Sequence, residues 1–143
     1  MSIIEGESSR TFSAGEVVFS EGDLGHEMYV IQSGSVEVTI DIDGEPHQVS
    51  TLERGDFFGE MSLLETLPRS ATVRCLEETS VLTIHSGTLL LRIRRDPTFA
   101  FEIIKRMSHK IRSTNHQLTE LKRELGQRHL DPVDAPGKWE RVE

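Results

Sequence analysis

Cysteine and long hydrophobic runs are both scarce in this chain of 143 residues, and each scarcity excludes a class of protein. The single cysteine, Cys75, has no partner for an internal disulfide, so the fold must depend on a hydrophobic core. No apolar run approaches the roughly 20 residues that a membrane-spanning helix needs. Acidic residues follow Met1-Ser2-Ile3-Ile4 at once, so we expect no secretory signal peptide. We therefore expect a cytoplasmic protein with no membrane partner.

Basic residues are scarce in the first part of the chain, because residues 1–91 carry 4 Lys/Arg against 16 Asp/Glu. This excess of carboxylates argues against nucleic-acid binding there, since attraction to phosphates supplies most of such affinity. Residues 92–130 reverse the balance, with 10 Lys/Arg and 4 Asp/Glu. We interpret this basic segment as a solvated helix face that complements the acidic part. The sequence therefore predicts no DNA partner.

Short segments typical of strands occupy residues 12–85. The clearest is 36–42, where Val or Ile alternates with Glu, Thr or Asp. Asp43-Gly44 follows, a dipeptide that favours a type I′ hairpin because both residues accept positive φ. The alternation over 71–75 predicts another strand, in which Cys75 faces inward as an inert thiol. Many short strands with glycine turns predict a sandwich or a barrel.

Helical patterns take over from Ser86, which we expect to cap a first helix. Asp96-Pro97 predicts the start of a second helix, with aspartate as the cap and proline in the first turn. Gly126 predicts its end. The apolar residues of the second helix recur at alternating three- and four-residue steps, as in a coiled coil. They are Ile104, Met107, Ile111, Leu118, Leu121 and Leu125, with Thr114 as a polar interruption.

This apolar seam has two alternative roles. It serves either to pack the helix on its own barrel or to pair with the same helix of a second copy. Because the seam is long for packing on a small barrel, we favour a parallel homodimer through helix 104–125.

Residues 58–73 combine a glycine, a short run of helix formers and an arginine nine residues after a glutamate. Gly59 allows close approach of the backbone to a ligand. Residues 60–64 predict one helical turn, whose first N–H groups lack internal partners and attract phosphate. Arg69 adds a charged fork fitted to phosphate oxygens. Glu60 would repel phosphate unless it accepts from a hydroxyl, as a ribose could donate. The stretch therefore predicts a site for a sugar phosphate of low charge.

The run Phe-Gly-Glu, then apolar residues, then Pro-Arg-Ser-Ala-Thr-Val resembles the phosphate-binding cassette of cyclic nucleotide-binding domains. The resemblance extends over about residues 12–125. It implies a mainly β fold with C-terminal helices (α+β), in which an eight-stranded jelly-roll barrel is followed by helices, the last one long. The resulting domains are a short flexible N-terminus (1–11), the nucleotide-binding domain (12–126) and a polar C-terminal tail (127–143). Within the domain, the barrel is about 12–85 and the helices are about 86–126.

The resemblance also implies residue roles. Glu60 holds the ribose 2′-hydroxyl, Arg69 pairs with the cyclic phosphate, and backbone N–H groups complete the site. The other residues expected to line it are Gly59, Met61, Ser62, Ser70, Ala71, Val38 and Ser50.

Bacterial catabolite activator-like proteins dimerise through the corresponding long helix. There a Thr-Ser pair meets the adenine amino group, the second residue from across the dimer. Thr114 and Asn115 occupy these positions; asparagine departs from the pattern, but its amide oxygen can still accept from the amine. Lys110, one turn earlier, is a further candidate contact. This pair favours cyclic AMP, with cyclic GMP as the alternative ligand, although a polar pair that only sets helix register is the other interpretation.

We therefore expect a cyclic nucleotide sensor, not an enzyme, that signals through its last helix to a dimer mate or to an effector protein in trans. The alternative is a dimerising scaffold whose pocket binds no cyclic mononucleotide. The 6 histidines show no His-x-His spacing, which argues against a metal oxygenase, and one cysteine excludes an iron–sulphur sensor. No cofactor or metal is expected. We expect no recognition helix within residues 127–143, and we expect Trp139 to pack on the chain itself, with packing on a partner as the alternative.

Overall fold

A computed structural model describes residues 3–128 of the chain, which divide into two compact units. One unit extends to Ile103 and the other starts at Ile104. The first contains the strands and two of the helices, and the second consists of the greater part of the last helix. The predicted tail beyond Arg128, with Trp139, lies outside the described residues.

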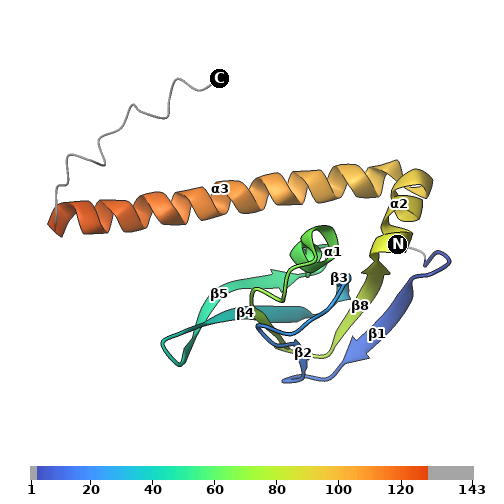
Figure 1. The fold of residues 1–143 in the computed structure, drawn as a ribbon, viewed down its shortest axis with the longest axis horizontal. Coiled ribbons are helices and arrows are strands. Elements are labelled where there is room, and N and C mark those ends of the chain that lie inside the picture. Colours follow the sequence, from blue (N-terminus) through green and yellow to red (C-terminus); the bar gives the residue numbers. More distant parts are fainter. Residues whose placement is uncertain (1–2, 129–143) are drawn as a thin grey trace, which may run out of the picture. The chain divides into compact units, whose positions relative to one another are not determined.

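Two antiparallel sheets of four strands each form the barrel (Figure 1). The strand orders are β1-β8-β3-β6 in one sheet and β2-β7-β4-β5 in the other. The strands are β1 Ser8–Phe12, β2 Val17–Phe19, β3 Glu27–Ser33, β4 Ser35–Ile42, β5 Glu45–Glu53, β6 Phe57–Phe58, β7 Thr72–Cys75 and β8 Thr79–His85. These strands, followed by helices, confirm the predicted jelly-roll architecture.

The hairpin between β4 and β5 has the predicted turn. Asp43 and Gly44 both adopt positive φ, 54° and 86°, as a type I′ turn requires. The pairing runs from Ile42 opposite Glu45 to Ser35 opposite Glu53, with one register shift near Val38. The hairpin brings the chain to β6, where the predicted cassette starts.

One continuous core fills the space between the sheets. Its members are Phe12, Tyr29, Ile31, Val36, Leu52, Phe58, Val73, Cys75 and Val81. Cys75 is 1% exposed, and burial raises the pKa of its thiol, which agrees with the predicted inert inward-facing residue. Side chains on the core side of each strand are therefore the ones available to line a site inside the barrel.

β1 begins at Ser8, earlier than Phe12, where the sequence analysis placed the first strand. Its first four residues are polar and exposed, so no hydrophobic alternation announces the strand. Backbone pairing with β8 forms it instead, from Ser8 opposite Thr83 to Phe12 opposite Thr79. The segment 1–11, predicted to be flexible, thus includes a paired strand.

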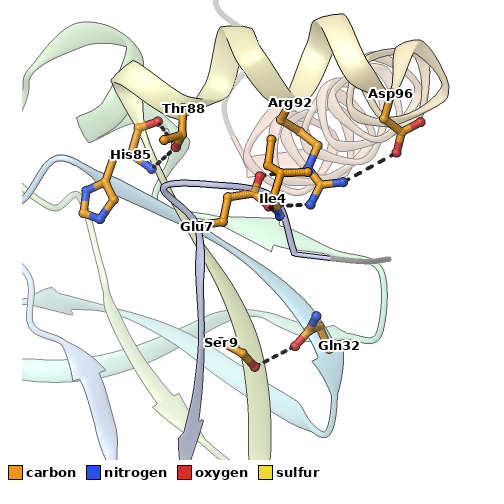
Figure 2. A network of polar contacts seen from close by, with 8 residues as sticks. All are labelled: Ile4, Glu7, Ser9, Gln32, His85, Thr88, Arg92 and Asp96. Atoms are coloured by element: carbon orange, nitrogen blue, oxygen red, sulfur yellow. Dashed lines mark hydrogen bonds and ion pairs between the residues drawn. The ribbon is translucent and has the colours of Figure 1, made fainter.

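A buried ion pair attaches the turn before β1 to α2, which spans Ser86–Arg95. The Arg92 Nε donates to Glu7 Oε2 at 2.8 Å, and Arg92 Nη2 donates to the other carboxylate oxygen (Figure 2). Glu7 Oε1 also accepts from the Ile4 amide at 3.1 Å. Arg92 Nη1 lies 3.8 Å from Oδ2 of Asp96, the residue at the α2–α3 junction. Arg92 therefore links the N-terminal turn to the start of the last helix.

The helix ends differ from expectation at two places. α2 starts at Ser86, but its N-cap is His85, because β8 stays extended through His85. The His85 amide donates to Thr88 Oγ1 at 3.1 Å. α3 spans Pro97–Arg128 and so continues past Gly126. A lone glycine inside a helix costs only about 1 kcal/mol relative to alanine, so it need not end one. The Asp96 cap is confirmed, since Asp96 Oδ1 accepts from the Phe99 amide at 3.2 Å.

The apolar seam of α3 is largely solvent-exposed. Ile104 and Ile111 are 63% and 62% exposed, and Leu118, Leu121 and Leu125 are 50–53% exposed. Within the described residues, no helix combines the length and the apolar character needed to cross a membrane.

Candidate functional site

The predicted cassette starts where β6 ends at Phe58. Gly59 follows with φ 83°, a left-handed conformation that favours glycine. A Cβ at this position would lie 2.8 Å from both Arg69 Nη1 and the Glu27 carbonyl oxygen. Gly59 is therefore required twice, by its backbone conformation and by the close approach of two chain segments.

α1, Glu60–Glu65, forms the predicted short helix directly after Gly59. It buries Ser62 and Leu63 and leaves Met61 45% exposed. Glu60 stands half-buried in the first turn, where backbone N–H groups have no partner within the helix. The helix thus presents donors and one carboxylate at its N-terminal end.

The helix ends in a strained residue. Thr66, at the C-cap of α1, has φ 55° and ψ 38°. A β-branched side chain is disfavoured in this left-handed region because its Cβ crowds the backbone. The chain then reverses through Leu67 and Pro68, which delivers Arg69 back to the start of α1.

Arg69 is only 4% exposed and is fixed at both its backbone and its guanidinium. Its amide donates to the Asp23 carbonyl at 2.9 Å, and its carbonyl accepts from the Gly22 amide at 2.8 Å. Nη1 donates to the Glu27 carbonyl at 2.8 Å and to the Gly59 carbonyl at 3.3 Å. Among residues 3–128, the guanidinium has no carboxylate partner, and Nε and Nη2 hold no hydrogen bond.

Aromatic rings support the guanidinium from the barrel side. Its central carbon lies 4.2 Å from the Phe19 ring centroid and 5.9 Å from that of Tyr29. Tyr29 in turn stacks on Phe58 at 5.1 Å between centroids. Such contacts attract a cation to the ring faces without neutralising its charge.

The Tyr29 hydroxyl donates to Glu27 Oε2 at 2.8 Å. Burial, followed by the hydrogen bond to Glu27 and the negative charge of Glu27, raises the pKa of Tyr29 to about 12. The phenol is therefore neutral at physiological pH.

The remaining predicted residues of the barrel lie next to the cassette in the sheet. Ala71 is 7% exposed, and Ser70 is exposed, with its Oγ 3.9 Å from Met61 Sδ. They lead into β7, which pairs with β4 so that Val38 lies opposite Val73. Val38 of β4 packs against the core, and Ser50 of β5 lies directly opposite Val38 in the sheet. Directly opposed residues share a face of a sheet, so Val38 and Ser50 share the core side.

Lys110, Thr114 and Asn115 are exposed on α3 in the second unit. Thr119 Oγ1 donates to the Asn115 carbonyl at 2.9 Å. Their contact with a ligand in the barrel stays a prediction.

Among the residues that the sequence analysis missed are three that lie against the Arg69 guanidinium, namely Phe19, Gly25 and Glu27. Glu27 acts through its backbone carbonyl, 42 residues before Arg69. Gly25 lies beside the guanidinium, since a Cβ there would be 2.5 Å from Nη2. A glycine in a loop and a carbonyl that any residue possesses carry no sequence signal of this role.

An open groove of about 620 Å³ lies on the other side of the sheet β2-β7-β4-β5. It is lined by Ser20, Glu21, Gly22, Thr39, Asp41, Gly44, Pro46 and Thr72. Its two carboxylates would repel a phosphate, so the groove is not the anion site that the cassette predicts. No cluster of three or more His, Cys, Asp or Glu within residues 3–128 could hold a metal ion.

Comparison with known proteins gives the family. A family model described as the cyclic nucleotide-binding domain matches residues 9–96. The chain is 32% identical over 110 residues to the cyclic AMP receptor protein of Thermus thermophilus, covering 76% of this chain and 51% of that protein. It is 43% identical over 67 residues to a cAMP-dependent protein kinase regulatory subunit of Blastocladiella emersonii, covering 46% of this chain and 17% of the subunit.

The structure agrees with these sequence relatives. The crystal structure of Thermus thermophilus catabolite activator protein is similar with a TM-score of 0.70 and 31% identity, over 81% of this chain and 55% of that one. The chain thus spans about half the length of the Thermus relative. Since the family model matches more than half of this chain and the fold is shared, the chain belongs to the cyclic nucleotide-binding domain family.

Proposed function

We propose that the chain is a regulatory module that binds a cyclic mononucleotide, with cyclic AMP preferred, at the cassette of residues 58–73. The observation that carries this proposal is the buried guanidinium of Arg69, which pairs with no carboxylate within residues 3–128. Keeping a charge out of water is costly unless an opposite charge compensates it. A singly charged cyclic phosphate would supply that charge and accept from Nε and Nη2.

The other groups of the cassette fit the rest of such a ligand. Amide hydrogens at the start of α1 would donate to the phosphate, and Glu60 would accept from the ribose hydroxyl. The base is assigned less directly. Thr114 and Asn115 favour an adenine amine, and the two sequence relatives described above are a cyclic AMP receptor and a cAMP-dependent kinase subunit. Cyclic GMP is the competing ligand.

The test is calorimetric titration of the purified chain with cyclic AMP and cyclic GMP. Wild type should bind cyclic AMP with micromolar or tighter affinity. Arg69→Ala should weaken binding by about 2–3 kcal/mol, as expected for loss of a buried charged hydrogen bond. The matched control is Arg74→Ala, which removes an exposed arginine of β7 and should leave the affinity unchanged. Equal affinities of wild type and Arg69→Ala would contradict the proposal.

For the output, we propose that ligand bound in the barrel changes the pairing or orientation of α3. A ligand can shift such an equilibrium only if it binds one state more tightly than the other, and contacts of the base with Thr114 and Asn115 would supply that difference. The exposed seam of α3 supports pairing with a second copy or with an effector protein. If no cyclic mononucleotide binds while α3 still pairs, the chain is a dimerising scaffold.

A further inference from the structure

A single loop of the barrel, residues 20–26 between β2 and β3, runs beside the phosphate arginine. Gly22 and Asp23 bind the backbone of Arg69 through two hydrogen bonds of 2.8 and 2.9 Å. Asp23 is itself held by the Ser20 amide, which donates to its carboxylate at 3.0 Å. The last residue of the loop leads to Glu27, whose carbonyl accepts from Nη1.

Gly25 is the residue of this loop that meets the guanidinium itself. A Cβ built on Gly25 would lie 2.5 Å from Nη2, 2.8 Å from Nε and 2.9 Å from Cζ. Real Cβ atoms do not approach other atoms this closely, so a side chain at position 25 would have to displace the guanidinium. Gly25 is not in the left-handed region, unlike Gly22 and Gly59. Its backbone conformation therefore does not require glycine, whereas the contact with Arg69 does.

The guanidinium has little room to move away. Phe19 lies against it with the ring centroid 4.2 Å from Cζ, and Nη1 is bound to the Glu27 and Gly59 carbonyls. The missing Cβ of Gly59 would be 2.8 Å from Nη1, so this end of the group is also closely confined. A displacement of the Nε–Nη2 edge would therefore break the bonds of Nη1 or lift the group from the ring.

We propose that Gly25 is a positioning residue for ligand binding. The absence of a side chain at position 25 lets Arg69 keep its buried position without a carbon atom against the Nε–Nη2 edge, which we propose to bind the phosphate. That edge carries two parallel N–H donors, the geometry that binds two oxygens of one phosphate. The proposal rests on the proposed function, because it concerns the same arginine and the same ligand.

The test compares Gly25→Ala with Gly87→Ala. Gly87 lies in α2, has no positive φ, and a Cβ there would meet no atom within 4 Å, so it is a matched glycine without the contact. Gly25→Ala should bind cyclic AMP about 10- to 100-fold more weakly, because small misplacements of a positioning group have effects of this size. Its melting temperature should stay within about 4 °C of wild type, since only the end of a flexible side chain must shift. Gly87→Ala should bind as wild type does.

A double-mutant cycle with Arg69→Ala separates positioning from a general effect on the fold. In the Arg69→Ala background, Gly25→Ala should change the affinity less than about twofold, because the group it displaces is absent. The same loss in both backgrounds, or wild-type affinity of Gly25→Ala, would overturn the proposal.

A second readout needs no ligand. The ¹⁵N–¹H signal of Arg69 Nε, assigned by its loss in Arg69→Lys, should move in Gly25→Ala and stay in place in Gly87→Ala. An unmoved signal would refute the positioning role. If wild type bound no cyclic nucleotide, the proposed function would fail together with the ligand role of Gly25, while this signal would still decide whether Gly25 positions the guanidinium.

Discussion

Individual residues of the cassette are held in costly arrangements. The charged guanidinium of Arg69 is buried, and its partners among the described residues are backbone carbonyls and aromatic rings. Thr66 ends α1 in the left-handed region. Such strained or incompletely compensated positions cluster at functional sites, where the surrounding structure maintains them. At Arg69 the cost would be recovered by a bound anion, whereas at Thr66 it is a property of the backbone alone.

Thr66→Gly is expected to stabilise the fold by about 1 kcal/mol. Glycine removes the Cβ penalty at φ 55°, and this gain exceeds the entropy that glycine adds to the unfolded chain. Urea denaturation measures the change. The control is Thr51→Gly, at an exposed position of β5, which should destabilise because it only adds unfolded-state entropy. A loss of stability in Thr66→Gly would show that the threonine side chain compensates its own strain.

Tyr29 should titrate with a midpoint of about 12 in the folded protein. It is the only tyrosine of the chain, so tyrosinate absorbance reports it alone. Because the folded pKa lies above the unfolded value, its contribution to stability is complete below about pH 10 and is lost as the pH rises through 12.

Glu27→Gln should lower this midpoint, since it removes the negative charge beside the phenol. The control is Glu37→Gln on β4, which should leave the Tyr29 midpoint unchanged. If Tyr29 of the native protein titrated near the midpoint of a free tyrosine, the hydrogen bond between Tyr29 and Glu27 would be contradicted.

At the scale of elements, the N-terminal turn and the two C-terminal helices are joined by one buried ion pair. The Glu7 side chain is fully buried and that of Arg92 is 3% exposed. Arg92 also lies over the Phe99 ring, 5.6 Å from its centroid, in the first turn of α3. The start of the chain is thereby tied to the helix through which we propose that the signal leaves.

Glu7→Ala should lower the free energy of unfolding by about 3–5 kcal/mol, because it removes the buried carboxylate that binds Arg92 Nε and Nη2. Guanidinium chloride denaturation measures the loss. Glu5→Ala removes a nearby exposed carboxylate and should have little effect. Similar losses for the two variants would argue that the ion pair contributes no more than a surface charge.

At the scale of the whole molecule, the exposed seam of α3 is expected to form a homodimer. Leu118→Glu should abolish it by burying a charge at the interface, and sedimentation velocity with and without cyclic AMP measures the mass. Arg112→Glu is the control, since it places the same side chain away from the seam. A monomeric wild type would contradict this prediction. If hydrogen exchange of α3 were the same with and without cyclic AMP, α3 would not transmit ligand binding.

The sequence by itself determined the strand-rich barrel, the Asp43-Gly44 hairpin and the inward Cys75, because each depends on local periodicity or on a short turn signal. The jelly roll and the cassette followed from the resemblance of residues 58–73 to a known family. Only the tertiary structure decided that β1 starts at Ser8, that Glu7 meets Arg92, and that Gly25 lies beside Arg69. These contacts join segments far apart in the chain: backbone pairing forms β1, a side-chain ion pair joins Glu7 to Arg92, and an absent side chain brings Gly25 against Arg69. Such partners leave no pattern in the sequence, and folding alone brings them together.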